Sequence, residues 1–407
     1  MSGGIKGFLS SRMERVRRSE IREILKLTEG RRIISFAGGL PDPSVFPKEK
    51  LADIAREVIE SEGDSALQYS PSRGVTSFRR VLRSFLESHG VSFASEDDLI
   101  VTTGSQEALY LIGKVLVDER DIVLIEEPGY LAAINVFHFY SNRLKGIPVD
   151  EYGLNTDALE DKVKRLIASG EKPKLIYTNP TCQNPTGATM PVERRKHLLE
   201  IASRYDLLIV EDDPYSFFTF YGERPPHLKA LDREDRVIYA GTFSKILVPG
   251  IRLGYAVAPE PVIAAMESMK QMIDLHTPTF SQYLTMRAIE RGVVDETIER
   301  AKRVYRIKRD AMINALEEEM RGLGSWTRPV GGFFTLLSLN MRIDTRELLV
   351  EAVEKANVAF VPAHSFYVEN VAPNTMRLSY SNPSKEDIDV GVRRLARLIK
   401  EKAGIQA

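Results

Sequence analysis

Among the lysines of this sequence, Lys245 has the most unusual neighbouring residues. It comes shortly after the apolar run Val237–Ala240, where a surface lysine is not expected, and a lysine amine can form a Schiff base with a carbonyl compound. The hydroxyl residues Thr242 and Ser244 precede it, and Arg252 follows seven residues later. These groups together could bind a phosphate beside the amine. Taken alone, any one of 56 basic residues is a solvated charge, so the neighbouring motifs decide its role.

Three other short motifs supply polar groups that could face the same ligand. Ser105 and Gln106 follow a glycine turn and would open a helix, whose free N–H groups suit a phosphate. Asn184, in an Asn-Pro-Thr-Gly turn, could donate a hydrogen bond to a phenolate oxygen. Asp212 could hold a protonated pyridine nitrogen, and Tyr215 could reach the same ligand. Each motif alone is equally well explained as an ordinary turn, helix cap or strand end.

The elements that would position these motifs alternate in a regular way. From about residue 98, short runs that are apolar on both faces are separated by helical patterns, which indicates a largely parallel sheet buried between helices. The runs are Leu99–Thr103, Ile122–Ile125, Leu175–Thr178, Leu207–Val210, Val237–Ala240 and Leu253–Ala258. The motifs follow the carboxyl ends of such strands, which is the edge where α/β proteins bind ligands.

The remaining chain predicts a second, smaller α+β domain. A helical stretch from Leu284 to about Glu319 precedes strands at Phe333–Leu339, Val358–Pro362 and Met376–Tyr380, and a final helix begins at Lys385. We therefore expect an α/β fold with a large domain at 46–283, a small domain at 284–407, and an N-terminal segment, 1–45, that packs with the small domain and the active site.

A phosphate cradle, a carboxylate for a ring nitrogen, partners for a phenolate and an amine are the set that pyridoxal phosphate needs. Its pyridinium acts as an electron sink, which an aspartate favours by keeping the nitrogen protonated. The single cysteine, Cys182, excludes a multi-cysteine zinc site, and the acidic segment at Asp212 has no histidine nearby, so no metal is expected.

With these motifs in order, the sequence resembles the fold-type I pyridoxal-phosphate-dependent aminotransferases. The nearest resemblance is to the subgroup of 2-aminoadipate, kynurenine and multi-substrate aromatic aminotransferases, from Gly38-Gly39-Leu40-Pro41 to Arg377. The resemblance implies that Lys245 anchors the cofactor and moves the substrate proton, that Arg377 binds the substrate α-carboxylate, and that Asn184 contacts the substrate as well as the cofactor. It implies that the other cofactor contacts are Ser105, Gln106, Tyr130, Asn184, Asp212, Tyr215, Thr242, Ser244 and Arg252, with Tyr130 stacked on the ring.

The resemblance also implies contacts outside this set. Tyr69 would reach the phosphate of a partner subunit, which implies a homodimer with shared active sites. Ser19 and Arg22 would belong to a mobile helix that recognises a distal substrate carboxylate, and Gly39 would let the backbone approach the substrate. Relatives often carry an aromatic residue where this chain has Cys182, whose simplest interpretation is a small buried residue.

Composition narrows the class of protein further. The net charge is −1 with 57 acidic residues, so a nucleic-acid partner is not expected. No apolar run approaches the length of a membrane span, and the first residues lack a signal-peptide core, so we expect a cytoplasmic protein.

The resemblance predicts a transaminase that moves the amino group of an amino acid (2-aminoadipate, aromatic or another donor) to a 2-oxo acid, with 2-oxoglutarate as the expected acceptor. A β-lyase or decarboxylase on the same fold shares almost every cofactor contact and stays open as an alternative. A cofactor-sensing transcription regulator is the less favoured alternative, because few residues precede Gly38 and the charge is balanced.

Overall fold

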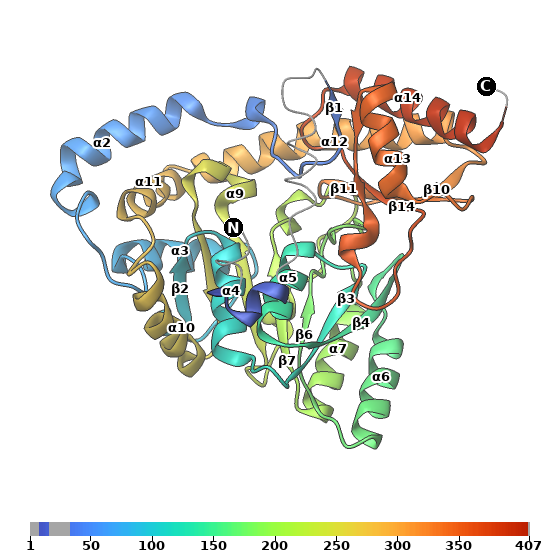
Figure 1. Cartoon of the computed structure of the whole chain (residues 1–407). Coiled ribbons are helices and arrows are strands. Elements are labelled where there is room, and N and C mark those ends of the chain that lie inside the picture. The colour runs from blue at the N-terminus through green and yellow to red at the C-terminus, as the bar shows by residue number, and fades with distance from the viewer. Residues whose placement is uncertain (1–7, 16–32, 406–407) are drawn as a thin grey trace.

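The computed structural model describes residues 8–15 and 33–405. Within these ranges the chain is built on one large sheet, with a smaller sheet at one end (Figure 1). The large sheet has eight strands, in the spatial order β2 (Leu99–Thr102), β9 (Gly254–Val257), β8 (Val237–Thr242), β7 (Leu208–Asp213), β6 (Pro173–Thr178), β3 (Ile122–Glu127), β4 (Arg143–Asp150) and β5 (Gly153–Leu154). Strands β4 and β5 were not among the predicted apolar runs, because β4 at the sheet margin alternates in burial.

The sheet is mostly parallel, as predicted, with two exceptions. Strands β8, β7, β6, β3 and β4 run parallel, whereas β9 is antiparallel to both of its neighbours and β5 is antiparallel to β4. The connection from β8 to β9 holds only α9 (Phe243–Ile246) and the 3₁₀ turn η6 (Pro249–Ile251). Because a parallel crossover needs a longer connection, β9 turns back, and its first residues lie at the edge where the parallel strands end.

Alternate strand residues pack against different helices, which explains why the strands are apolar on both faces. Val123 and Ile125 pack in one hydrophobic cluster with α4 (Ser105–Leu116), α5 (Leu131–Tyr140) and α10 (Glu260–Ile273). Ile122 and Leu124 pack in another with α6 (Thr156–Ala168) and α7 (Val192–Tyr205). A third cluster on β2, β8 and β9 includes side chains of α2 (Lys48–Ala66), α3 (Thr76–Ser88) and α11 (Thr279–Glu290).

The smaller sheet is antiparallel and has four strands in the described ranges. Its order is β10 (Gly324–Trp326), β11 (Phe334–Leu339), β14 (Thr375–Ser379) and β13 (Val361–Pro362). Helices α12 (Val293–Glu319) and α14 (Lys385–Ala403) pack together beside it (Figure 1). Smaller elements complete the chain: η2 (Ser11–Arg15), η3 (Pro43–Val45), η4 (Glu96–Asp98), η5 (Ser216–Phe218), α8 (Leu228–Leu231), α13 (Thr345–Glu351), η7 (Ala352–Ala356) and η8 (Ala363–Phe366).

The predicted single helix from Leu284 to Glu319 is two helices. α11 ends at Glu290 and α12 begins at Val293, because Gly292 adopts φ +69°, a left-handed conformation that stops a helix. The first half of α12 packs in the cluster on β2, β8 and β9, and its second half packs in the core of the smaller sheet. α12 therefore links the two parts of the molecule.

The N-terminal segment contacts the smaller part. β1 (Ile34–Ser35) pairs in parallel with β12 (Val358–Ala359), and the buried Phe36 joins the same hydrophobic core as α14. The predicted strand at 358–362 is thus two short strands, since β12 pairs with β1 whereas β13 pairs with β14. The division at residues 45 and 283 remains our proposal for the domains.

Candidate active site

A cavity of about 180 Å³ lies at the edge where the parallel strands end. Residues from several separate segments of the chain line it: Ser105, Gln106, Tyr130, Asn179, Asn184, Asp212, Pro214, Tyr215, Thr242, Ser244, Lys245, Pro249 and Arg252. The structure therefore brings together most of the residues that the sequence analysis singled out. Arg377 and Gly39 join them through hydrogen bonds to Asn184 and Lys245.

One end of the cavity is built to receive an anion. Helix α4 begins at Ser105 after Gly104, which adopts φ +82° and has no side chain to cover the first N–H groups. A Cβ on Gly104 would lie 2.6 Å from Nη2 of Arg252, so only glycine lets that guanidinium approach the helix start. Arg252 Nη1 donates to Ser244 Oγ at 3.2 Å. A helix N-terminus beside an arginine and a hydroxyl fits a phosphate group.

Lys245 projects from the short helix α9 and lies partly buried in the cavity wall. Its Nζ donates to the backbone carbonyl of Gly39 at 2.8 Å. Burial lowers the pKa of Lys245 to about 8, and the positive charges of Arg377 and Arg252 act in the same direction. A large fraction of this amine is therefore neutral near pH 8, as nucleophilic attack on a carbonyl requires.

Asp212, at the end of β7, offers an unused acceptor to the cavity. Its Oδ2 accepts a hydrogen bond from Tyr177 Oη at 2.7 Å, whereas its buried Oδ1 has no hydrogen-bond partner among the described residues. Burial raises the pKa of Asp212 to about 7. A buried carboxylate oxygen without a donor fits the protonated ring nitrogen of a pyridine.

Arg377 is fully buried and contacts Asn184, one of the residues that line the cavity. Its Nη1 donates to Asn184 Oδ1 at 2.9 Å and its Nη2 donates to the carbonyl of Ala37 at 2.5 Å. Its Nε has no acceptor in the part of the chain that the structure describes. The guanidinium carbon lies 4.2 Å from the ring centre of Phe334, and burial lowers the pKa of Arg377 to about 10. A buried guanidinium with a free donor suits a planar carboxylate.

Comparison with known proteins agrees with this geometry. The family model for aminotransferase class I and II matches residues 37–395. The chain belongs to the class I and II aminotransferase family. The predicted family, fold type, enzyme class and cofactor, a pyridoxal-phosphate-dependent aminotransferase of fold type I, are confirmed.

Three relatives of this aminotransferase illustrate the similarity. It is 44% identical over 395 residues to aromatic-amino-acid aminotransferase 1 of Thermococcus litoralis, covering 97% of this chain and 94% of that one. The crystal structure of kynurenine aminotransferase from Pyrococcus horikoshii, in complex with PMP, superimposes with a TM-score of 0.94 at 44% identity, over 100% of this chain and 99% of that one. The α-aminoadipate aminotransferase of Thermus thermophilus, complexed with N-(5'-phosphopyridoxyl)-L-leucine, gives 0.90 at 40% identity, over 98% and 99%.

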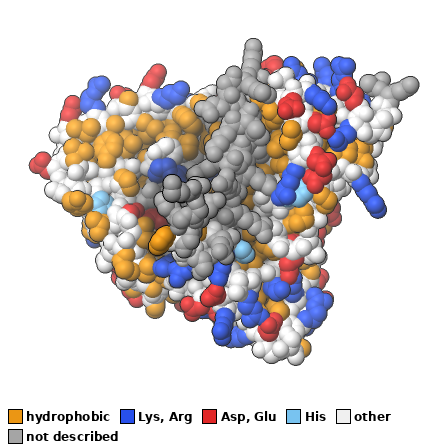
Figure 2. Space-filling model, viewed as in Figure 1, with side chains coloured by type: hydrophobic (Ala, Val, Ile, Leu, Met, Phe, Trp, Pro, Cys, Tyr) orange, Lys and Arg blue, Asp and Glu red, His pale blue; other side chains and the backbone are white. Residues whose placement is uncertain are grey.

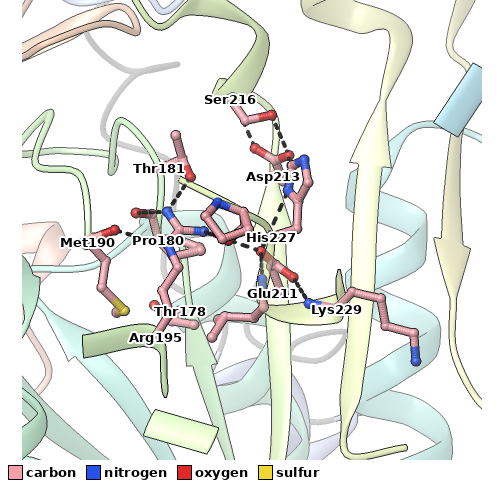
Figure 3. Close-up of polar contacts among 12 residues, drawn as sticks. Thr178, Pro180, Thr181, Met190, Arg195, Glu211, Asp213, Ser216, His227 and Lys229 are labelled. Carbon is pink, nitrogen blue, oxygen red and sulfur yellow. Dashed lines mark hydrogen bonds and ion pairs between the residues drawn. The ribbon is translucent and has the colours of Figure 1, made fainter. Parts of the chain in front are cut away.

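A layer of buried polar side chains next to the cavity holds the loops of this aminotransferase in place (Figure 3). Arg195 donates to the carbonyls of Pro180 and Met190, both at 3.0 Å, and thereby closes the loop that carries Asn184. Asp213 accepts from the backbone N–H of Ser216 at 3.0 Å, which fixes the turn that follows Tyr215. The site residues thus lie on loops whose backbones are tied to buried charges.

Two residues at the site were missed in the sequence. Tyr177 donates to the Asp212 carboxylate, and Asn179 donates from Nδ2 to the Asp212 carbonyl at 2.6 Å while accepting from Asn184 N at 2.8 Å. Tyr177 was counted only as part of an apolar strand. Tyr177 pairs with Val210 on the neighbouring strand, and Asp212 lies two residues after Val210, so Tyr177 and Asp212 are on the same face of the sheet. This alternation of side chains along neighbouring strands is the sequence signal that could have identified Tyr177.

Tyr69 is not among the described residues that line the cavity. Tyr69 is 77% exposed and touches His276 edge-on, with ring centres 5.6 Å apart. Ser19 and Arg22 lie outside the described residues. The carbonyl of Gly39 accepts a hydrogen bond from Lys245, and a Cβ at this position would lie 2.7 Å from Cζ of Phe334.

Cys182 is buried, as predicted. It packs against Gly332, where an added Cβ would lie 2.6 Å from the Cys182 Cβ. Burial raises the pKa of its thiol to about 12, so the thiolate is scarce at neutral pH and a nucleophilic role is not supported.

The described residues contain no helix that is long and apolar enough to cross a membrane. They also contain no group of three or more histidine, cysteine, aspartate and glutamate side chains placed to hold a metal ion.

Proposed function

We propose that this chain transfers the amino group of an L-amino acid to a 2-oxo acid, with 2-oxoglutarate as acceptor and 2-aminoadipate or an aromatic amino acid as donor. One observation carries the proposal. A single cavity places the amine of Lys245 with the unsatisfied Asp212 Oδ1, and Arg377, whose Nε has no acceptor among the described residues, donates to Asn184 in the wall of that cavity. The names of the relatives support the two donor classes.

Each side chain has a separate task in this proposal. Pyridoxal phosphate, when bound, supplies an aldehyde for the amines and a pyridinium ring that accepts electrons from the substrate Cα. Asp212 would hold the ring nitrogen, Asn184 and Tyr215 would bind the phenolate oxygen, and Tyr130 would stack on the ring. Ser105, Gln106, Thr242, Ser244 and Arg252, which line the cavity near the start of α4, would hold the phosphate.

Lys245 and Arg377 act on the substrate. Arg377 binds the α-carboxylate and thereby orients the Cα–H bond. The Nζ of Lys245 would remove the proton from the substrate Cα and hold it for the return step. A positioned base of this kind contributes about 10²–10⁴-fold to the rate. The pKa of about 8 leaves part of the amine unprotonated for this task.

The test is Lys245→Ala, assayed with a panel of amino donors and 2-oxoglutarate. We expect transamination to be abolished together with the absorbance of the lysine-bound cofactor, whereas wild-type protein forms glutamate from the preferred donor. Turnover by the variant at the wild-type rate would refute the proposal. Release of pyruvate and ammonia without an acceptor would establish the lyase alternative instead.

We also propose a cytoplasmic homodimer in which Tyr69 reaches the partner's phosphate site. Hydrophobic side chains gather over the α2 side of the molecule (Figure 2). Ile59, Leu67 and Tyr69, in and just after α2, are all at least half exposed in the single chain. A contiguous exposed apolar surface of this kind marks a protein interface. Sedimentation of the wild-type chain as a monomer at micromolar concentration would refute the dimer.

A further inference from the structure

Tyr177 and Asp212 form a buried pair on neighbouring parallel strands. Tyr177 is 0% exposed and Asp212 is 3% exposed, and the phenol donates to Asp212 Oδ2 at 2.7 Å. Asp212 lines the cavity, and its Oδ1 is the oxygen left without a donor among the described residues. The two oxygens of one carboxylate therefore have different partners: one is held by the protein and the other is open.

We propose that Tyr177 is a positioning residue, which fixes the oxygen that Asp212 presents to the cofactor and keeps this carboxyl group ionised. The inference rests on the proposed role of Asp212 as the partner of the ring nitrogen. A phenol has one proton to donate, and by donating it to Oδ2 Tyr177 holds the carboxylate in one orientation. Oδ1 is then the acceptor that remains for a pyridinium N–H.

The surroundings of Asp212 explain why the carboxylate needs this donor. Burial raises its pKa, the negative charges of Asp213 and Glu126 raise it further, and the hydrogen bond from Tyr177 lowers it. The titratable groups that face it come from β3, β6, β7 and the loops after β3 and β7: Glu126, Tyr177, Asp213, Tyr130 and Tyr215. Without the phenol, Asp212 takes up a proton more readily, and a protonated carboxyl no longer stabilises a pyridinium.

The chain contains a matched control pair. Tyr239 on β8 is also 0% exposed, and its hydroxyl donates to Asp213 Oδ2 at 2.8 Å. Neither residue is among those that line the described cavity. Tyr239→Phe removes the same kind of hydrogen bond from the neighbouring carboxylate, so a general loss of buried polar contacts would affect both variants equally.

The experiment compares holoenzymes reconstituted with pyridoxal phosphate labelled with nitrogen-15 in the ring. In the wild type and in Tyr239→Phe, the nitrogen signal should report a protonated ring. In Tyr177→Phe it should move toward the unprotonated position. Because the pyridinium then loses its charge-assisted hydrogen bond to an ionised Asp212, the dissociation constant of the cofactor should rise by about 10- to 100-fold, against less than about threefold for Tyr239→Phe. A wild-type nitrogen signal and wild-type affinity in Tyr177→Phe would overturn the inference.

Two further variants separate the possible failures. If Asp212→Asn leaves the ring-nitrogen signal unchanged, the proposed role of Asp212 itself is wrong. If Asp212→Asn changes the signal and Tyr177→Phe does not, only the role of Tyr177 is wrong. Should Tyr177→Phe fold poorly, 3-fluorotyrosine at position 177 keeps the shape and strengthens the donor. In the cofactor-free protein, Asp212 should then stay ionised to lower pH, and an unchanged titration of Asp212 would overturn the inference.

Discussion

Arg377→Lys tests the central claim about substrate recognition, that a fork of donors binds the α-carboxylate. Lysine keeps the positive charge but loses the planar pair of N–H groups. In the structure, Nη1 and Nη2 of Arg377 are held by Asn184 and Ala37, and Nε has no acceptor among the described residues. The guanidinium also lies over Phe334, a planar contact that an ammonium group does not reproduce.

The magnitude follows from the bonds lost. A hydrogen bond to a charged group contributes about 1.5–3 kcal/mol, and tenfold corresponds to about 1.4 kcal/mol, so we expect kcat/KM for amino acids to fall about 10- to 150-fold. Cofactor affinity should stay within about threefold of the wild type, since the loss concerns a substrate contact. The assay measures kcat/KM for the preferred amino acid and for the corresponding amine that lacks the α-carboxylate.

The control is Arg309→Lys. Arg309 is also an arginine with a hydrogen bond to a carbonyl, that of Pro329 at 2.8 Å, but unlike Arg377 its hydrogen bonds go to Pro329 and Asp310, which do not line the cavity. In this variant, kcat/KM for the amino acid and for the amine should both stay near the wild-type values. If Arg377→Lys slows the amine as much as the amino acid, the arginine does not recognise the carboxylate, and the reasoning is refuted.

Two further predictions concern the amine and the anion end of the cavity. Because the pKa of Lys245 is lowered to about 8, its acetylation in the cofactor-free protein should rise with pH up to about 8 and then level off, as measured by mass spectrometry, whereas exposed lysines go on rising toward about 10.4. An inflection of Lys245 at the exposed-lysine value would contradict the burial argument. Gly104→Ala should weaken cofactor binding at least about tenfold, since its Cβ would lie 2.6 Å from Arg252 and φ is +82°. Gly170→Ala is the matched control, with φ +79° and no described heavy atom within 4 Å of its Cβ, so equal cofactor dissociation constants in the two variants would show that the contact with Arg252 is irrelevant.

Much of the large domain could be predicted because the sequence patterns that specify its strands are local. Runs such as Ile122–Ile125 are apolar on both faces, and burial between two layers of helices is the stable arrangement for such strands. The parallel arrangement put Asp212 and Lys245 at one edge of the sheet, since Asp212 lies at the carboxyl end of β7 and Lys245 follows that of the neighbouring β8. β9 was harder to predict, because its direction depends on the short connection at 243–253 and not on its own composition.

The sequence by itself determined the inventory of the site: an amine after a buried strand, a carboxylate, an amide, hydroxyls and two arginines in a fixed order. The tertiary structure decided which of their atoms are free. The difference between Asp212 Oδ1 and Oδ2 arises because Tyr177, 35 residues earlier, lies on the next strand in register with this face. The lowered pKa of Lys245 depends on burial and on Arg377, which lies far along the chain in the smaller sheet. Such contacts depend on how segments far apart in the sequence pack together, and local sequence patterns carry no information about that packing.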